Sequence, residues 1–183
     1  MARIFTKTGD RGETGQFDGT RVPKNDPLIE VNGTIDECNS ILGVVRSFND
    51  DARLDGILKH FQSLLVVAGS EVTNVENDSR LPFINEADIQ ALENLIDELE
   101  QEIPPLKNLI LPAGGKIPAH LHLARTASRK VERRLVTLQE TAEVNQTLPA
   151  YFNRLSDTLF VLARHAAHQN GGSDEVWKNP AKE

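Results

Sequence analysis

Hydrophobic residues recur every three or four positions along most of this chain, the spacing that places them on one face of an α-helix. After the first 27 residues, five segments with this pattern follow one another. Helices are expected at about residues 28–48, 54–73, 85–103, 118–139 and 149–169. Each has one apolar stripe, and the connections between them are short. The pattern therefore predicts an all-α fold, a five-helix bundle.

The expected ends of these helices coincide with turn-forming residues. Asn49-Asp50-Asp51 breaks the first helix, and a polar stretch at 74–83 follows the second. Asn85 is a good N-cap for the third helix, with Asp88 three positions later. A proline pair at 104–105 ends that helix, and Gly171-Gly172 ends the fifth. One domain spanning 1–183 is predicted, with an N-terminal loop at 1–27, a bundle at 28–170 and a C-terminal tail at 171–183.

The first candidate site is the glycine-rich N-terminal loop, in which glycine, threonine and lysine are dense. Its sequence is Thr6-Lys7-Thr8-Gly9-Asp10-Arg11-Gly12-Glu13-Thr14. Glycines let the backbone approach a ligand closely, and free N–H groups, hydroxyls and a lysine can gather around an anion. This composition predicts a phosphate-binding loop. It is not a Walker A loop, because no Gly-Lys-Ser/Thr triplet opens a helix. The alternative is a polar N-terminal turn.

The second candidate site is one face of the fourth predicted helix, which carries Arg125, Arg129 and Arg133 at steps of four residues. Such residues share a face, about 6 Å apart along the axis. Glu132 lies on nearly the same face. Arginine is suited to bidentate contact with phosphate, so the stack indicates a polyanion site. The alternative is a solvated face with salt bridges between successive turns.

Charge and composition exclude several classes of function. The formal net charge is −7, so general nucleic-acid binding is not expected and any anion site must be a local basic cluster. Cys38 is the only cysteine, which rules out an internal disulfide. No basic-then-apolar leader opens the chain, and the longest apolar run, 64–68, is far too short to span a membrane. A soluble, cytoplasmic protein is expected.

The histidines are candidate metal ligands. His120 and His122 lie on opposite sides of a helix, whereas His165 and His168 are three residues apart and could share an ion. A di-iron bundle needs a glutamate three residues before a histidine, and none occurs here. Packed or surface histidines are therefore favoured over a metal site.

Six motifs occur in order at characteristic spacings, and together they closely resemble the PduO-type ATP:cob(I)alamin adenosyltransferases over about residues 3–170. The motifs are Thr6-Lys7-Thr8-Gly9-Asp10-x-Gly12, Arg21-Val22-Pro23-Lys24-Asn25-Asp26, Gly33-Thr34-Ile35-Asp36-Glu37-x-Asn39, Ile110-Leu111-Pro112-Ala113-Gly114-Gly115, Ala124-Arg125-Thr126-x-x-Arg129-Lys130-x-Glu132-Arg133-Arg134 and Tyr151-Phe152-Asn153-Arg154-Leu155-Ser156-Asp157. The resemblance implies a ferritin-like five-helix bundle that forms a homotrimer, with ATP sites in clefts between subunits.

The resemblance also implies a reaction: the 5′-deoxyadenosyl group of ATP passes to cob(I)alamin, forming adenosylcobalamin and releasing triphosphate. Cobalt(I) is itself a strong nucleophile, so the protein needs no general base and supplies position and charge. ATP would enter with Mg²⁺, and K⁺ is a further candidate ion. The implied partners are a corrinoid reductase and an adenosylcobalamin-dependent enzyme. The Asp-x-His-x-x-Gly motif that supplies a histidine to cobalt elsewhere is absent from the chain.

Site residues follow from the matching positions. Arg129 and Asp36 are the implied catalytic residues, with Asp36 pairing with Arg129 across a subunit contact. Glu132 would lie near Mg²⁺, reaching it through water or phosphate. The implied ATP-binding residues are Thr6, Lys7, Thr8, Gly9, Thr14, Gly15, Lys24, Arg129, Lys130, Val131, Glu132, Arg133 and Asn153.

Two positions depart from the family pattern. Leu109 stands where the family usually has a phenylalanine that faces cobalamin and displaces its lower axial ligand. Gly15-Gln16-Phe17 stands where a hydroxyl residue and apolar residues are more usual. Two competing hypotheses are a nucleotide-sensing or corrinoid-handling trimer without turnover, and a purely structural bundle. The intact Lys24, Arg129, Arg133 and Asn153 favour the enzyme.

Overall fold

The computed structural model describes residues 4–16, 19–74, 81–169 and 171–182. Within these ranges the chain forms five α-helices, which confirms the predicted five-helix bundle. The helices are α1 (Pro27–Ser47), α2 (Ala52–Val72), α3 (Glu86–Glu100), α4 (Lys116–Leu138) and α5 (Thr147–Gln169). Residues 75–80 of the predicted loop at 74–83 lie outside the described residues, as does Phe17.

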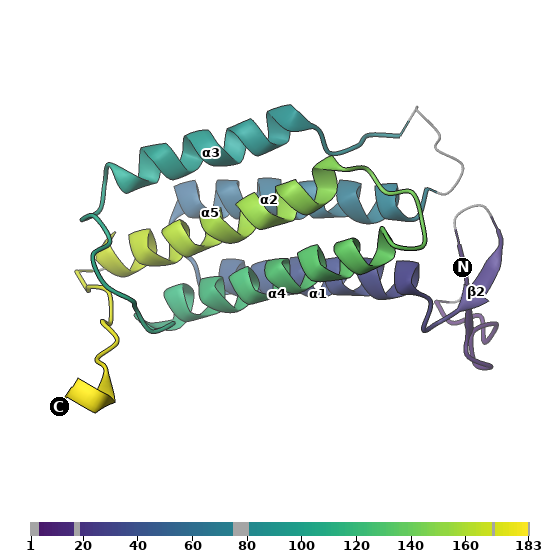
Figure 1. The fold of residues 1–183 in the computed structure, drawn as a ribbon, viewed down its shortest axis with the longest axis horizontal. Helices are drawn as coiled ribbons and strands as arrows, with labels where there is room; N and C mark the ends of the chain where they lie inside the picture. Colours follow the sequence, from purple (N-terminus) through teal and green to yellow (C-terminus); the bar gives the residue numbers. More distant parts are fainter. Residues whose placement is uncertain (1–3, 17–18, 75–80, 170, 183) are drawn as a thin grey trace.

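The helices lie side by side along the long axis of the molecule (Figure 1). Helix α4 packs against α1 and α5, while α2 packs against α1 and α3 against α5. A small N-terminal hairpin lies beside the first turn of α1, at the end of the bundle where α4 finishes. The C-terminal tail lies at the opposite end. No described helix is both long and apolar enough to cross a membrane.

Side-chain caps determine where three of the helices begin. Asp26 caps α1 by accepting from the Leu28 N–H, and Asp51 caps α2 by accepting from two N–H groups of its first turn. Asn85 caps α3 and forms a reciprocal capping box with Asp88, as the sequence predicts. Helix α2 begins two residues before its predicted start, because Asp51 both ends one segment and caps the next.

Helices α4 and α5 also begin before their predicted starts, at Lys116 and Thr147. Pro118 and Pro149 are each the third residue of their helix. Backbone N–H groups in the first turn have no partner inside the helix, so proline loses no hydrogen bond there. The two prolines therefore belong to the first turns of α4 and α5, and the predicted starts after them are too late.

The apolar stripes of the helices meet in one core. Leu42, Leu58, Leu121, Leu135 and Leu155 are each completely buried. Full burial of such a side chain stabilises the fold by about 1.5–3 kcal/mol. Cys38 belongs to this core, and burial, with a smaller contribution from the charge of Glu37, raises the pKa of its thiol to about 12. It therefore remains a packed, neutral thiol.

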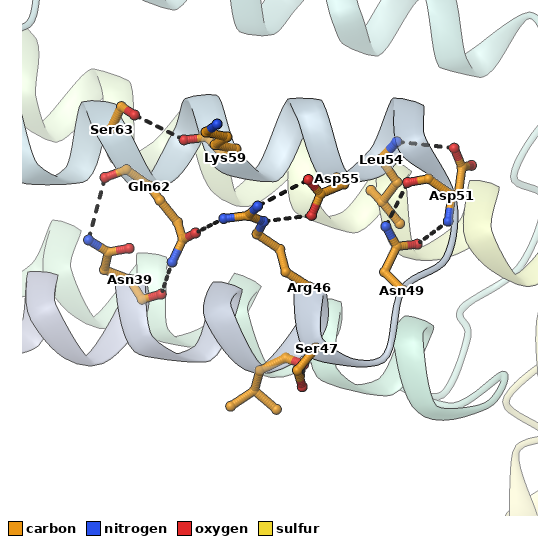
Figure 2. A network of polar contacts seen from close by, with 11 residues as sticks. Asn39, Arg46, Ser47, Asn49, Asp51, Leu54, Asp55, Lys59, Gln62 and Ser63 are labelled. Carbon is orange, nitrogen blue, oxygen red and sulfur yellow. Dashed lines mark hydrogen bonds and ion pairs between the residues drawn. The ribbon is translucent and has the colours of Figure 1, made fainter.

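Polar contacts fix α1 against α2 (Figure 2). Arg46 binds Asp55 through two hydrogen bonds, of 2.7 and 3.0 Å, and donates a third to Gln62 at 2.9 Å. Gln62 donates in turn to the backbone oxygen of Asn39 at 3.1 Å. The hydrogen bond from Arg46 is the main reason that the pKa of Asp55 is lowered. These contacts fix the alignment of α1 and α2, and this alignment shapes the groove between the two helices.

Two features were not predicted from the sequence. The N-terminal loop contains a two-stranded antiparallel hairpin, β1 (Glu13–Gly15) with β2 (Arg21–Pro23). The C-terminal tail pairs with the segment before α4 through an antiparallel bridge between Ile110 and Val176, and it ends in a single 3₁₀ turn, Pro180–Lys182.

Candidate functional site

The N-terminal loop brings Lys24 against the backbone of Gly9. A Cβ placed on Gly9 would lie 3.4 Å from Nζ of Lys24 and 3.2 Å from the carbonyl oxygen of Glu13, so the Lys24 side chain and the β1 backbone both approach Gly9 closely. The Thr6 and Thr8 hydroxyls are hydrogen bonded to each other at 2.8 Å. The structure thus gathers four of the predicted phosphate-binding residues in one loop.

The hairpin holds this loop in shape. Arg21 of β2 donates to the carbonyl oxygen of Thr8 at 2.7 Å and forms an ion pair with Glu13 at 3.3 Å. Lys7 has a positive φ of 62°, which is uncommon for a residue other than glycine. Thr14 lies on β1 opposite Val22, and Gly15 follows it opposite Arg21. The hairpin and the contacts of Arg21 therefore fix the shape of the described part of this loop.

The cations of α4 divide into two groups. Lys130 pairs with Glu37 of α1 at 2.8 Å, and Arg134 pairs with Glu30 of α1 at 3.2 Å. Arg129 and Arg133 are both exposed. Among the described residues, neither has a carboxylate within ion-pair distance. Arg133 donates from Nη1 to the backbone oxygen of Arg129 at 3.0 Å. These two arginines are thus left available to an anion, and the arrangement is not a fully salt-bridged face.

Glu132 and Asn153 lie next to the two free arginines. Asn153 of α5 donates from Nδ2 to Oε1 of Glu132 at 3.0 Å. Val131 is completely buried, so its side chain faces the core and not the arginine face. The structure brings the arginines, Glu132 and Asn153 together. It shows no contact between them and the described part of the N-terminal loop within one chain.

Asp36 does not meet Arg129 within the described chain. Its neighbour Glu37 faces α4. Because successive residues of a helix are rotated by about 100° around its axis, Asp36 points in a different direction from Glu37. Asp36 instead lines an open groove of about 420 Å³ between α1 and α2, with Asn32 and Gly69. The two implied catalytic residues are therefore separated inside one chain, and the pairing of Asp36 with Arg129 stays a prediction that requires a second chain.

Leu109 lies at the far end of α4 from the hairpin, in the segment that precedes this helix. Its side chain is 73% exposed. Beside it is a pocket of about 190 Å³, which Arg125, His122 and Phe160 also line. The Trp177 N–H donates to the carbonyl oxygen of Leu109 at 2.8 Å, so the tail borders this region. The sequence predicts a C-terminal tail at 171–183 but not its contact with this region, although Val176 and Trp177 form an apolar pair in an otherwise polar segment.

The histidines contact separate groups. His165 pairs with Glu102 at 2.8 Å, and His168 lies 3.4 Å from Asp174. His122 is buried, and His120 lies on the other side of α4 with its Nδ1 2.7 Å from the Lys116 carbonyl oxygen. In the described ranges, no group of three or more histidine, cysteine or acidic residues could hold a metal ion.

The structure thus combines a helical bundle with a glycine-rich cationic loop and two arginines on one helix that have no carboxylate partner among the described residues, an arrangement that suits a polyanion. The family model "Cobalamin adenosyltransferase" matches residues 4–166. The chain therefore belongs to the cobalamin adenosyltransferase family.

Curated proteins and solved structures are similar to this chain over most of its length. A corrinoid adenosyltransferase of Citrobacter freundii is 42% identical over 166 residues, which covers 90% of this chain and 94% of that protein. Corrinoid adenosyltransferase MMAB of Mus musculus is 35% identical, covering 97% and 78%. A phenylalanine-to-alanine variant of the PduO-type ATP:corrinoid adenosyltransferase from Lactobacillus reuteri, complexed with cobalamin and ATP, has a TM-score of 0.92 at 34% identity, covering 97% of this chain and 100% of that one.

Proposed function

We propose that this protein transfers the 5′-deoxyadenosyl group of ATP to cob(I)alamin, forming adenosylcobalamin and releasing triphosphate. The observation that carries this proposal is the selective pairing on α4. Lys130 and Arg134 are engaged by carboxylates of α1, while Arg129 and Arg133, beside Glu132, have no carboxylate partner in the part of the chain that the structure describes. The similarity to proteins named corrinoid adenosyltransferases supports the same conclusion.

The reaction is a displacement at C5′ of ATP. The electron pair of cobalt(I) forms the cobalt–carbon bond, and the C5′–O bond breaks with its pair leaving on triphosphate. In the proposed site, Arg129, Arg133 and Lys24 stabilise the negative charge that grows on this leaving group. No proton has to be removed from either reactant, so the chemistry needs no histidine base. The protein's task is to hold C5′ in line with cobalt and to neutralise the triphosphate.

We propose that Mg²⁺ enters bound to the ATP phosphates. Mg²⁺ prefers oxygen ligands and usually keeps several of its waters, so one protein carboxylate beside the phosphates is enough. Glu132 offers this, because its Oε1 accepts from Asn153 and its Oε2 has no partner among the described residues. K⁺ remains a second candidate ion of the same site.

The proposed active unit is a homotrimer with ATP bound between subunits. Asp36 and Arg129 lie apart in one chain, and the N-terminal loop makes no described contact with the arginine face of its own α4. A cleft between two chains brings both sets together. We place the enzyme in the cytoplasm, where a corrinoid reductase supplies cob(I)alamin and an adenosylcobalamin-dependent enzyme takes the product.

Analysis of the products distinguishes the proposed enzyme from a protein that binds ATP and corrinoid without turnover. The enzyme is incubated with MgATP and chemically reduced cobalamin, and phosphorus NMR follows the nucleotide. One triphosphate is expected for each adenosylcobalamin formed. Release of ADP or pyrophosphate, or unchanged ATP beside bound corrinoid, contradicts the proposed reaction.

A further inference from the structure

Ser128 carries a hydroxyl at a completely buried position of α4. Its neighbours on the same face of the helix, Ala124 and Val131, are also completely buried, so the hydroxyl lies in an apolar part of the core. A hydroxyl without a hydrogen bond in such surroundings costs free energy. Ser128 avoids this cost by donating from Oγ to the carbonyl oxygen of Phe152 at 2.7 Å. Because Phe152 belongs to α5, this buried hydrogen bond joins two helices.

Neither helix needs this hydrogen bond in order to form. The carbonyl oxygen of Phe152 accepts a backbone N–H from the next turn of α5, so it is satisfied without Ser128. One hydrogen bond contributes only about 0.5–1.5 kcal/mol to stability, and alanine would fit the same space. Other hydroxyls of the two helices, those of Thr126, Ser156 and Thr158, bind carbonyl oxygens of their own helix. The hydroxyl of Ser128 therefore differs from these in the helix that it contacts.

The buried hydrogen bond lies directly beside the proposed nucleotide site. Phe152 immediately precedes Asn153, and Glu132 lies one turn after Ser128 on the same face of α4. Asn153 donates from Nδ2 to Oε1 of Glu132 at 3.0 Å, and both of these residues are only half-buried. Two hydrogen bonds thus link α4 to α5 about one turn apart. Together they fix the sliding and the rotation of one helix against the other.

We propose that Ser128 is a positioning residue, whose hydroxyl holds α5 against α4 so that Asn153 meets Glu132 in the orientation that the nucleotide requires. Ser128 contacts neither substrate and acts through Asn153. A displacement of about 1 Å at a binding site can cost far more in turnover than the lost hydrogen bond costs in stability. This role rests on the proposed function and adds a buried residue behind the same ATP site.

A double-mutant cycle in MgATP affinity tests this role, measured by calorimetry without corrinoid. Ser128→Ala should weaken MgATP binding about tenfold and lower kcat at least as much, because Asn153 is misplaced. In an Asn153→Ala background, the same change should weaken binding by less than about twofold, because the group that it positions is gone. Ser128→Cys keeps the volume and a weak donor, so its affinity should lie between those of the wild type and Ser128→Ala.

Thr158→Val is the matched control. It also removes a completely buried hydroxyl, but one that donates to the carbonyl oxygen of Arg154 in its own helix, at 2.9 Å. Its MgATP affinity should stay within about twofold of the wild type, because the contact between α4 and α5 is unchanged. Circular dichroism confirms that each variant is folded, and Ser128→Cys replaces Ser128→Ala in the cycle if the latter is not.

Three outcomes would overturn the positioning role. They are wild-type MgATP affinity in folded Ser128→Ala, an equal loss in the Asn153→Ala background, and an equal loss in Thr158→Val. The proposed function fails separately. A wild-type protein that binds MgATP but forms no adenosylcobalamin refutes the reaction, while the cycle in MgATP affinity still decides the role of Ser128. A wild-type protein that binds no MgATP overturns both.

Discussion

At the scale of single residues, ion-pair partners determine which basic side chains of α4 remain available to a ligand. The sequence predicts that α4 carries a basic stack, but it cannot show which members are paired. Glu37 and Lys130 are 93 positions apart, and only the packing of α1 on α4 brings them together. The same packing buries Val131 and half of Arg125 while leaving Arg129 exposed. Residue type and spacing therefore predict a candidate site, and tertiary contacts show which of its cations already pair with a carboxylate of the same chain.

The free arginine gives the first prediction. Arg129→Ala should lower kcat at least about 100-fold, because it removes a charge that stabilises the leaving triphosphate. Asp36→Asn should also lower turnover, by leaving Arg129 without its orienting partner. Arg134→Ala is the control, because it removes only an exposed ion pair with Glu30, a contact of about 0–1 kcal/mol. Steady-state kinetics decide the matter, and near-normal rates for both test variants would show that the site is elsewhere.

Leu109 gives the second prediction. If an apolar side chain beneath the corrin displaces the lower ligand of cobalt, a larger planar ring should do so more completely. Leu109→Phe should raise the four-coordinate fraction of cob(II)alamin bound with ATP, with room for the ring because Leu109 is exposed. The gain is bounded by a few CH₂ equivalents at about 0.8 kcal/mol each, and ATP affinity should not change. Electron paramagnetic resonance measures the fraction. An unchanged spectrum would assign the role to another residue.

At the scale of elements, local signals and long-range contacts differ in what they reveal. Helix number and type followed from apolar periodicity, and the cap at Asn85 from residue type alone. The early starts of α4 and α5 were missed because a proline fits the first turn as well as a boundary. The three-residue strands and the tail bridge were missed because such short segments carry no periodic pattern. Their pairing depends on partners, such as Ile110 for Val176, that sequence spacing does not identify.

The tail is attached through Asp174, which gives a pH prediction. Burial alone would raise the pKa of Asp174, but hydrogen bonds from Arg164 and His168 outweigh it and the pKa is lowered. A lowered pKa means that this contact stabilises the fold above the unfolded value of about 3.9 and is lost as pH falls below it. Trp177, the only tryptophan, should report tail release below about pH 4 by fluorescence.

Asp174→Ala should release the tail at neutral pH, because it leaves the buried Arg164 without its carboxylate. Removing one partner of a buried pair typically costs about 3–5 kcal/mol. Tryptophan emission in this variant at pH 7 should match that of the wild type in acid, with helical circular dichroism retained. Identical emission from the variant and the wild type at pH 7 would show that the tail is held by other contacts.

At the scale of the whole molecule, one chain has the parts of the site but not their assembly. Exposed apolar side chains such as Val66 and Leu123 lie on the outer faces of the helices, and the groove lined by Asp36 is open. We therefore expect a stable homotrimer. Light scattering at micromolar concentration should give three times the mass of the 20.3 kDa chain. A monomer mass would contradict a site shared between chains. If the charges of Asp36 and Arg129 are both reversed in one variant, the ion pair between chains is kept, so assembly should be restored but turnover should not.

The central claim is that this chain makes a cobalt–carbon bond from ATP and cob(I)alamin. The direct measurement is the absorbance of chemically reduced cobalamin after addition of MgATP and enzyme, with Arg129→Ala in parallel. We predict that the cob(I)alamin spectrum is replaced by that of adenosylcobalamin, and that Arg129→Ala forms adenosylcobalamin at least about 100-fold more slowly. Light should then cleave the cobalt–carbon bond of the product and change its spectrum again. A cob(I)alamin spectrum that persists in the presence of folded enzyme and ATP would contradict it.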